Sequence, residues 1–432
     1  MTHPLLAPDY KAEPFWWDRS PRPGVEDPDL PGQTDVLVIG SGYTGLNAAI
    51  QTSRGGRRTV VIDAEAIGWG CSSRNGGQIS SSIKPKYHEL VPKFGEELAH
   101  GIVSEGHAAL EWIGDFIAQE GIDCDFARVG RYYAAHTPAK FEALARDQDK
   151  VVPGIDTGSF LVRRSEQASE IDTDLYHGGV VHPRHASLDP GRYHNGLFDL
   201  AGQAGVQIVP QCRALSIAGR PGRLEVETSK GRIRAHNVIV ATSGYTGDLT
   251  PWHRRRIIPI GSYVLATEPL APGVIERLIP KNRVITDTRR LVVYYRACPD
   301  RRRIIFGGRV SISETDATRV APQLHAELVR IFPELAATRM SHAWMGFVGY
   351  TFDSMPHLGV RDGVHYSMGY CGSGISLSSY LGRKIGLQVL GDAQGDSPLG
   401  RIPFETRSYY WGKPWFLGPS IGYYRWHDRR TA

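Results

Sequence analysis

The chain has 432 residues, of which 41% are hydrophobic and 22% are charged, and its formal net charge at pH 7 is +5. This length predicts about two domains, and the composition is that of an ordinary globular protein. So mild a charge gives no reason to expect a nucleic-acid partner, although an anionic substrate or cofactor is compatible with it. The five cysteines lie far apart with no C-x-x-C pair, so the sequence predicts neither a disulfide framework nor a zinc site.

Residues 1–33 are rich in proline and contain no apolar run that resembles a secretory signal. No segment approaches the roughly eighteen apolar residues that a membrane-spanning helix needs. We therefore expect a cytoplasmic protein with reduced thiols and no membrane partner. The first 33 residues are interpreted as an extended arm, attached to the body by the adjacent aromatic residues at positions 15–17.

A glycine-rich turn between a predicted strand and a predicted helix is the strongest local pattern. Residues 36–39 are a short, mostly β-branched apolar run, typical of a strand buried on both faces, and residues 44–54 have the pattern of a helix. Gly40, Gly42 and Gly45 match G-x-G-x-x-G. In that motif the glycines permit a tight turn, the close approach of a pyrophosphate and close packing of the helix on the strand.

A second β-branched run, residues 59–62, ends at Asp63. An acid at the carboxyl end of this strand can accept hydrogen bonds from both ribose hydroxyls of an adenine dinucleotide. Arg57 and Arg58 precede the strand, so we expect them to lie at its solvent-exposed start and not to bind a 2′-phosphate. Together these features predict an adenine dinucleotide site, and they leave FAD and NAD both open.

The segment after Asp63 leaves the first sheet. Residues 68–78 contain too many glycines and small polar residues for a regular element. They predict either a loop whose backbone lies against a flat or charged group, or an ordinary surface loop. Helical periodicity follows at residues 87–120, and a shorter helical piece is predicted at residues 141–148.

The middle of the chain returns to short strands. The predicted elements are a helix at 190–205, strands at 206–209 and 214–217, a hairpin at 224–234 and a strand that begins at 237. The last strand ends in small polar residues and glycine by residue 246, so it would deliver a second backbone loop to the same sheet edge. His182, His185 and His194 match no metal-binding spacing, and we predict no metal site.

The remaining third of the chain predicts a second sheet and a third glycine-rich loop. Antiparallel strands are expected at 257–268, 284–285, 291–296 and 303–307, with a short helix at 324–332. A strand at 364–368 runs into a glycine-rich loop and then into a helix at 375–390. The aromatic, proline-bearing tail at 401–425 is interpreted as an irregular segment packed over the body.

Several of these motifs together resemble one superfamily. They are the opening loop with Asp63, GWGCSSRNGG from residue 68, IVATSGYTG from residue 239, W-x-G-F-x-x-x-T-x-D-x-x-P at 344–356 and GYCGSGISLSSYLGRKIG from residue 369. In this order they resemble the FAD-dependent amine and amino-acid oxidases of the D-amino-acid oxidase and sarcosine oxidase superfamily. Within it, R-N-G-G at 74–77, SYVLATEPL from residue 262 and GKPWFLGPSIGYYR from residue 412 are most similar to the gamma-glutamylputrescine oxidases.

The resemblance implies an α/β fold, α+β overall, with a Rossmann-like FAD-binding domain and a mostly antiparallel β-sheet substrate domain. The implied division is an N-terminal arm at 1–33, a discontinuous FAD-binding domain at 34–90, 171–250 and 345–400, a substrate-binding domain at 91–170 and 251–344, and a C-terminal packed tail at 401–432. The flavin ring is expected at the boundary between the two domains.

The resemblance also implies FAD as the cofactor and assigns residues to it. These are Gly40, Ser41, Gly42, Thr44, Gly45, Asp63, Ala64, Cys71, Ser72, Arg74, Asn75, Gly76, Gly77, Ala214, Thr242, Gly244, Gly372, Ser373, Gly374, Ile375 and Ser376. Asp63 is expected to hold the ribose, and the backbone of Ala214 is expected to touch the adenine. The loop at 71–77 would lie along the flavin, and the amides of 372–376 would face its O2 side.

Three departures from the sarcosine oxidase pattern carry predictions of their own. Val348 stands where those enzymes attach flavin through cysteine. No histidine lies between Asp63 and Gln78, where dimethylglycine-type relatives have one, so the FAD is predicted to be non-covalent. Ser376 stands roughly where a lysine grips the substrate carboxylate, which argues against a small N-methyl amino acid as substrate. The lysine linked to oxygen activation falls near Ile305 or Phe306, so oxidase and dehydrogenase both remain open.

The implied reaction is oxidation of a primary or secondary amine, with hydride transfer to the flavin and hydrolysis of the imine. An extended amine, such as a gamma-glutamyl conjugate, is the expected substrate, with molecular oxygen or another electron acceptor. Tyr295 is expected either to face the substrate or to pack in the sheet, and Arg296 or Arg184 to meet a distant carboxylate. The alternatives are an amino-acid or opine dehydrogenase, a small amino-acid oxidase of the sarcosine or glycine type, and a non-catalytic flavin scaffold.

Overall fold

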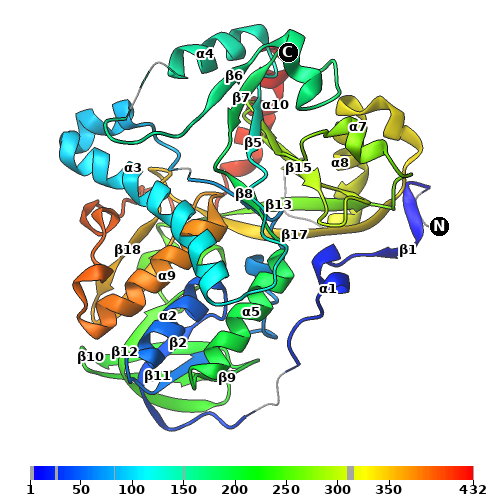
Figure 1. Ribbon diagram of the computed structural model, residues 1–432. Coiled ribbons are helices and arrows are strands. Elements are labelled where there is room, and N and C mark those ends of the chain that lie inside the picture. The colour runs from blue at the N-terminus through cyan, green and yellow to red at the C-terminus, as the bar shows by residue number, and fades with distance from the viewer. Residues whose placement is uncertain are drawn as a thin grey trace.

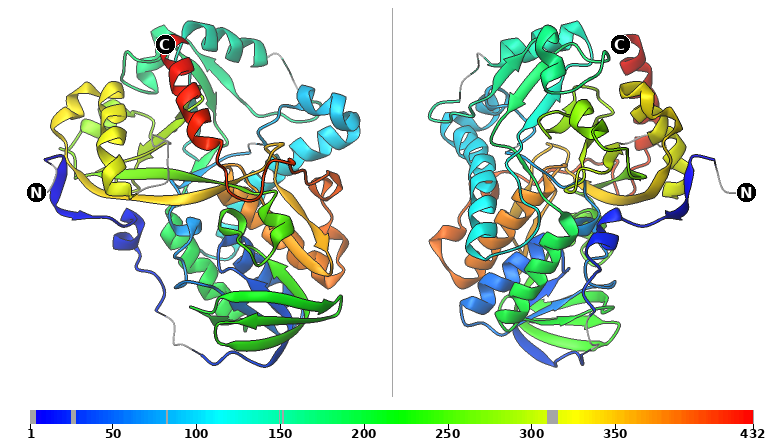
Figure 2. Two further views of the ribbon diagram at one scale, coloured as in Figure 1. Left: turned by 180° about the vertical axis from the view of Figure 1, so that it is seen from behind. Right: turned by 45° about the vertical axis from the view of Figure 1, so that its right-hand side comes forward.

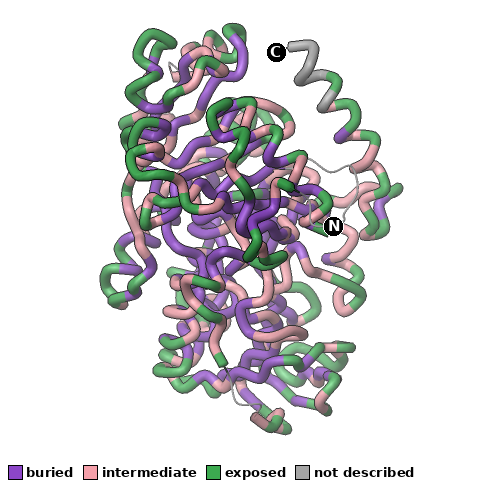
Figure 3. The backbone as a smooth tube through the Cα atoms, turned by 90° about the vertical axis from the view of Figure 1, so that its right-hand side faces the viewer, coloured by how far each residue is buried: buried purple, intermediate pink, exposed green. Residues whose placement is uncertain are grey.

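Two large β-sheets form the two halves of the molecule (Figure 1). The computed structural model describes residues 4–24, 28–81, 83–148, 150, 152–308 and 316–431. One sheet has eight strands with a parallel centre, and the other has nine strands that are mostly antiparallel. Buried backbone is concentrated along both sheets and where they approach each other (Figure 3). This arrangement confirms the predicted fold class.

The eight-stranded sheet contains the predicted dinucleotide strands. Its members are β2 (Gln33–Ile39), β3 (Thr59–Ile62), β9 (Gln207–Val209), β10 (Ala214–Arg220), β11 (Arg223–Thr228), β12 (Gly231–Val240), β18 (His357–Arg361) and β19 (Val364–Met368). The central strands β19, β12, β2, β3 and β9 pair in parallel. Because Val36 and Val38 pack into one core and Leu37 and Ile39 into another, β2 is buried on both faces, as its apolar run predicted.

Four helices lie on one side of this sheet. They are α2 (Tyr43–Arg54), α3 (Tyr87–Gln119), α5 (Pro190–Gln203) and α9 (Gly374–Leu390), and they share a single apolar core with the sheet. The side chain of Asp189 begins α5 by accepting hydrogen bonds from the backbone amides of Gly191 and Arg192. Within α3, Gly95 has a φ of 79°, so two helical pieces meet at a kink there.

The nine-stranded sheet forms the other half. Its strands are, in spatial order, β1 (Leu6–Lys11), β17 (Met340–Tyr350), β13 (Ile258–Thr267), β16 (Ile304–Gly308), β15 (Val293–Ala297), β14 (Val284–Asp287), β5 (Arg131–Ala134), β7 (Gly179–His182) and β6 (Phe160–Val162). Helix α8 (Ala317–Ile331) packs Val320, Leu324 and Leu328 against one face. It begins seven residues before the predicted residue 324, because the Asp316 side chain caps it, and it contains Pro322 in its interior.

Several smaller elements complete the fold. They are α4 (Pro138–Gln148), α6 (Pro251–Arg254), α7 (Val274–Leu278) and a two-stranded ladder of β4 (Gln78–Ile79) with β8 (Ala186–Ser187). Helix α4 confirms the helical piece predicted at 141–148 and extends it by three residues at its start.

The N-terminal arm is more ordered than an extended segment. It contributes β1, which pairs in parallel with β17, and the short helix α1 (Phe15–Arg19). Trp16 is completely buried, and its indole Nε1 donates a hydrogen bond to the carbonyl oxygen of Asn75 at 2.8 Å. The predicted aromatic attachment is therefore confirmed, and the extended arm also contains a strand and a short helix that the sequence analysis did not predict.

Two of the predicted domain boundaries differ from the sheet pairing. The segment 171–250 was assigned to the FAD-binding domain, but β7 within it pairs with β5 and β6 of the nine-stranded sheet. The segment 345–400 likewise begins inside β17, which continues in that sheet to Tyr350. A short apolar strand has the same local pattern in either sheet, so the sequence does not reveal which one it joins.

The C-terminal tail ends in a helix, so the prediction of an irregular segment is wrong beyond residue 416. Helix α10 (Leu417–Thr431) runs along the molecule on the side opposite the view of Figure 1, as the left view of Figure 2 shows in red. Two glycines and a proline, Gly418, Pro419 and Gly422, dilute its helical pattern in the sequence.

Candidate functional site

A cavity of about 1180 Å³ lies between the two sheets. Its walls include the carboxyl ends of the parallel strands, at Gly40, Asp63 and Thr242, and residues of the nine-stranded sheet, among them Thr286 and Tyr294. All three glycine-rich loops predicted from the sequence reach it. The cavity is therefore placed where open parallel sheets bind ligands, outside the carboxyl ends of their strands.

The G-x-G-x-x-G loop has the close contacts that the motif requires. Gly40 adopts a φ of +108°, a conformation that favours glycine, and a Cβ on Gly45 would lie 1.8 Å from the carbonyl oxygen of Gly40. Gly40, Ser41, Gly42 and Thr44 line the cavity at the start of α2, whereas Gly45 lies behind them. The amino end of α2 thus opens onto the cavity, as pyrophosphate binding needs.

Asp63 is held in place at the end of β3. Its Oδ2 accepts hydrogen bonds from the backbone amide and the hydroxyl of Ser41, at 2.8 and 2.7 Å, and its Oδ1 accepts one from the amide of Glu65 at 3.0 Å. A carboxylate has about four acceptor positions, so it keeps capacity for a ribose hydroxyl. Ala64 and Ala214 line the cavity beside it, which fits the adenosine end of FAD.

The loop at residues 68–78 is held in place by contacts with tryptophan side chains. Trp344 Nε1 donates a hydrogen bond to the carbonyl of Arg74 at 2.7 Å, and the Arg74 guanidinium lies 4.7 Å from the ring centres of both Trp17 and Trp69. Cys71, Ser72, Arg74, Asn75 and Gly76 line the cavity. Gly77 does not, because its carbonyl oxygen accepts a hydrogen bond from Arg296 at 2.7 Å.

The other two loops bring backbone to the cavity from different directions. Thr242 and Gly244 line it after β12, and Gly372, Ser373, Gly374 and Ile375 line it at the start of the 17-residue helix α9. The backbone amides at the amino end of this helix stabilise negative charge. They are therefore suited to face the flavin O2, as the resemblance implied. Ser376 is not among the lining residues, because it is buried and its hydroxyl donates to the carbonyl of Ser80 at 2.9 Å.

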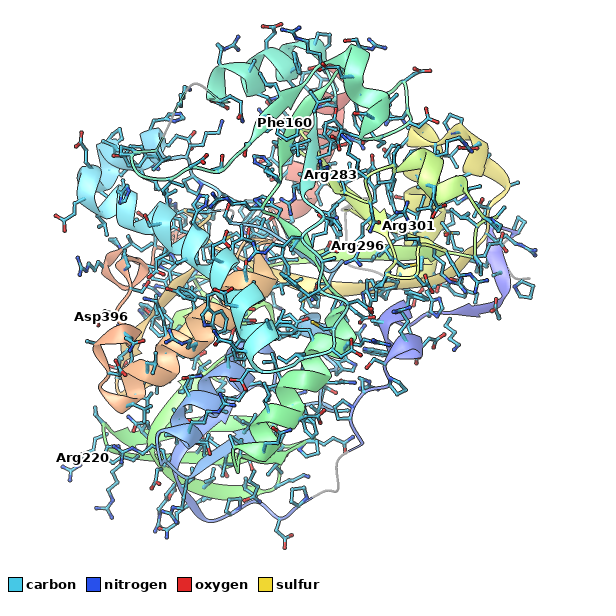
Figure 4. All side chains as sticks on the ribbon, in the orientation of Figure 1. Phe160, Arg220, Arg283, Arg296, Arg301 and Asp396 are labelled. Carbon is cyan, nitrogen blue, oxygen red and sulfur yellow. The ribbon has the colours of Figure 1, made fainter. Side chains whose placement is uncertain are left out.

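Neither Tyr295 nor Arg296 lines the cavity. Tyr295 is fully buried on the α8 side of the sheet, where its ring stacks on Phe306 and its hydroxyl lies 3.2 Å from that of Tyr176. Arg296 is buried in the middle of the molecule, where Figure 4 labels it, and donates to the carbonyl oxygens of Gly77 and Leu188. The structure therefore places both side chains away from a substrate bound in this cavity.

Tyr294, the neighbour of Tyr295, faces the cavity instead. Side chains alternate between the two faces of a strand, so a difference of one residue exchanges the α8 side for the cavity side. The Tyr294 hydroxyl lies 3.0 Å from that of Ser262, and burial raises the pKa of Tyr294 to about 12. The sequence offered no local signal for this difference, because the residues that bury Tyr295 are brought together by the pairing of distant strands.

The C-terminal segment contributes a wall that the sequence analysis did not identify. Phe416, Leu417, Ser420, Ile421 and Tyr424 line the cavity. The guanidinium of Arg290, between β14 and β15, lies 5.5 Å from the ring centre of Tyr424. The GKPWFLGPSIGYYR motif therefore forms part of the site rather than a peripheral cover.

Comparisons with known proteins agree with this site. Residues 35–386 match the family model described as FAD dependent oxidoreductase. The chain belongs to this family. It is 30% identical over 385 residues to the gamma-glutamylputrescine oxidoreductase of Escherichia coli, covering 85% of this chain and 86% of the relative. It is 28% identical over 364 residues to the probable oxidoreductase OrdL of Haemophilus influenzae, covering 83% of each.

Solved structures show the same fold. Glycine oxidase from Geobacillus kaustophilus superposes with a TM-score of 0.73 at 15% identity, covering 88% of this chain and all of that one. L-proline dehydrogenase from P. horikoshii superposes with a TM-score of 0.69 at 17% identity, covering 90% and 99%. The match to the family model makes FAD the cofactor of this oxidoreductase, and the described loops fit it.

Neither a metal cluster nor a membrane span is found in the part of the chain that the structure describes. No group of three or more histidine, cysteine, aspartate or glutamate side chains there is arranged to hold a metal ion. No helix there is both long and apolar enough to cross a bilayer.

We expect the FAD to be released when the protein is precipitated with acid. Val348 lines the cavity where an attaching cysteine would stand, and burial raises the pKa of the Cys71 thiol to about 11, which keeps it protonated and unreactive. The measurement is the flavin absorbance of supernatant and pellet after trichloroacetic acid treatment. Yellow colour in the pellet would contradict the prediction, and its disappearance in Cys71→Ser would identify the attachment site.

Proposed function

We propose that this oxidoreductase oxidises an extended amine, such as a gamma-glutamyl conjugate of a diamine, at the carbon next to its free or alkylated nitrogen. The observation that carries the proposal is the 30% identity to gamma-glutamylputrescine oxidoreductase across 85% of the chain. The cavity supports it, because 1180 Å³ exceeds the roughly 300 to 1,000 Å³ of a typical single-ligand site. A site that holds cofactor and a long substrate together needs this extra volume.

The cavity walls are suited to binding a neutral amine. FAD supplies the oxidising group when it is bound. Tyr294 and Ser262 present hydroxyl groups, and the raised pKa of Tyr294 keeps its phenol uncharged at neutral pH. Phe416 and Ile421 add apolar surface that limits the access of bulk water. We propose that these residues bind and orient the amine and that none of them acts as a strong base.

The position of Ser376 argues against a small amino acid. Its buried hydroxyl is bonded to a backbone carbonyl, so this position offers no cation to a carboxylate close to the flavin. A lost charge-assisted hydrogen bond weakens binding by roughly 1.5 to 3 kcal/mol, on the order of ten- to a hundredfold. We therefore infer that any substrate carboxylate is recognised farther from the reacting carbon.

The electron acceptor that we propose is molecular oxygen, with hydrogen peroxide as the product. A dehydrogenase is the second candidate, because the positions near the oxygen-activating lysine of sarcosine oxidases are occupied by the buried apolar residues Ile305 and Phe306. Parallel assays with oxygen and with an artificial dye acceptor separate the two. Turnover only with the dye would favour the dehydrogenase.

Steady-state kinetics with a matched set of amines test the substrate. We expect gamma-glutamylputrescine and similar conjugates to give a catalytic efficiency at least about tenfold above sarcosine, glycine and proline, for the electrostatic reason given above. A higher efficiency with sarcosine or glycine would restore the small amino-acid oxidase. Failure of every amine to reduce the flavin under anaerobic conditions would instead favour a non-catalytic flavin scaffold.

A further inference from the structure

Arg131, at the start of β5, is a cavity-lining cation without an acidic partner in the part of the chain that the structure describes. Its Nε is buried and makes no hydrogen bond. Burial lowers the pKa of Arg131 to about 10, so the guanidinium is still charged at neutral pH. Burying a charge without a counter-ion is unfavourable, which makes this position unusual for a purely structural arginine.

The other cations of the cavity wall are engaged or exposed. Arg213 pairs with Glu65 at 2.9 Å, and Arg74 donates to the carbonyl oxygens of Trp69 and Met345. The Arg290 guanidinium lies over the ring of Tyr424, and Lys84 is exposed with its Nζ 5.3 Å from the ring centre of Tyr350. Arg131 therefore differs from them in having a buried donor that nothing in the described chain satisfies.

Thr286, on the adjacent strand β14, presents a second unsatisfied group. Its Oγ1 is buried without a hydrogen-bond partner and lines the same cavity. In the parallel pairing of β14 with β5, Val284 lies opposite Arg131 and Thr286 lies opposite Tyr133, so all four side chains share one face of the sheet. The Arg131 guanidinium and the Thr286 hydroxyl thus face the same cavity from neighbouring strands, and each has hydrogen-bonding capacity left over.

The titratable groups around Arg131 add no negative charge. His182 lies opposite Arg131 on β7, and its ring stacks on His185 at 5.0 Å. Burial and the nearby guanidinium lower the pKa of both rings, to about 4 for His182, so both are neutral at pH 7. Burial raises the pKa of the neighbouring Tyr133, so its phenol is also uncharged. No acidic side chain in the part of the chain that the structure describes supplies a counter-charge to Arg131, which leaves this position suited to an anionic ligand.

We propose that Arg131 and Thr286 form the subsite that binds the carboxylate of the substrate. The inference rests on the proposed function and deepens it, because a gamma-glutamyl group carries a free carboxylate at the end remote from the reacting amine. A carboxylate matches the fork of guanidinium donors and accepts the threonine hydroxyl as a further donor. The subsite lies on strands β5 and β14 of the nine-stranded sheet, and neither strand carries an FAD-binding loop.

The kinetic test compares two substrates that differ only at this end. N-Glutarylputrescine carries a terminal carboxylate, whereas N-butanoylputrescine has the same chain without it. In Arg131→Gln the efficiency with the first should fall roughly ten- to a hundredfold and that with the second should change less than about threefold. Thr286→Val should give a smaller loss of the same selectivity. Equal losses with both substrates, or no loss with either, would overturn the proposal.

A binding test separates this proposal from the proposed function. Glutarate, a dicarboxylate that cannot be oxidised as an amine, is titrated into the holoenzyme and followed by calorimetry. Wild type should bind it, and Arg131→Gln should weaken binding at least about tenfold. If glutarate binding depends on Arg131 but no conjugate is oxidised, the proposed function fails and the subsite stands. If conjugates are oxidised but neither glutarate binding nor selectivity responds, the subsite fails alone.

Two further variants keep the test decisive. Arg184→Gln removes an exposed arginine that does not line the cavity, and it should leave selectivity and glutarate affinity unchanged. If Arg131→Gln does not fold, Arg131→Lys retains the charge but loses the paired donors of the guanidinium. It should then show an intermediate loss of glutarate affinity, and wild-type affinity in this variant would contradict the assignment.

Discussion

Replacing Gly45 with alanine is expected to destabilise the dinucleotide domain strongly and to prevent FAD binding. A Cβ at this position lies 1.8 Å from the carbonyl oxygen of Gly40 and 3.2 Å from Cγ1 of Val38. Because the first of these atoms belongs to the backbone, no side-chain rotation relieves the overlap, and α2 must move away from β2. Overpacking of this kind costs about 1 to 3 kcal/mol, and a backbone clash places the effect at or above the upper end.

The displacement cannot remain local. Helix α9 also packs closely on α2, since a Cβ on Gly382 would lie 2.5 Å from the carbonyl oxygen of Thr44. Moving α2 therefore disturbs both the amino end that faces the pyrophosphate and the contact with α9. Thermal unfolding with saturating FAD, together with the flavin content after purification, measures the two consequences.

A matched control is available in the last turn of α5. Gly202 is exposed, and a Cβ added to it would meet no atom within 4 Å, so Gly202→Ala should leave stability unchanged or raise it by about 0.5 to 1 kcal/mol. Wild-type stability and full flavin content in Gly45→Ala would show that α2 does not approach β2 as described.

The elements that could be predicted from the sequence are those set by local pattern. Strand β3 and strand β19 occur at the predicted residues, and α2 and α9 each begin one residue earlier than predicted. In these segments the apolar run, the glycine turn and the helical periodicity all indicate the same structure. The local sequence is therefore enough to predict these elements without knowledge of their tertiary contacts. The parallel strand order then brings the three glycine loops to one cavity.

The features that could not be predicted depend on neighbours distant in sequence. The face on which Tyr294 lies is fixed by the pairing of β14, β15 and β16, and a local pattern of two adjacent tyrosines does not distinguish them. The isolation of Arg131 is likewise invisible in the sequence, because an absent acidic neighbour is a property of the folded surroundings. Helix α10 was missed because its glycines and proline outweigh its periodicity.

Asp63→Ala is expected to lose most of its FAD during purification. The substitution removes the acceptor of three hydrogen bonds in the protein, from the Ser41 amide, the Ser41 hydroxyl and the Glu65 amide. It also removes the acceptor that we assign to the ribose. Each lost charge-assisted hydrogen bond costs roughly 1.5 to 3 kcal/mol, so the Kd for FAD should rise at least about ten- to a hundredfold.

Titration of FAD into the apoprotein, followed by flavin fluorescence, measures this change. Asp63→Asn keeps one acceptor oxygen without the charge and should fall between wild type and alanine. Asp35→Ala is the control, because Asp35 lies on β2 outside the cavity lining and pairs with Arg58 at 3.2 Å. Its loss should not change the affinity for FAD. Unchanged FAD affinity in Asp63→Ala would mean that the carboxylate orients the Ser41 loop without touching the cofactor. The ribose would then need another partner among the residues that line the same end of the cavity.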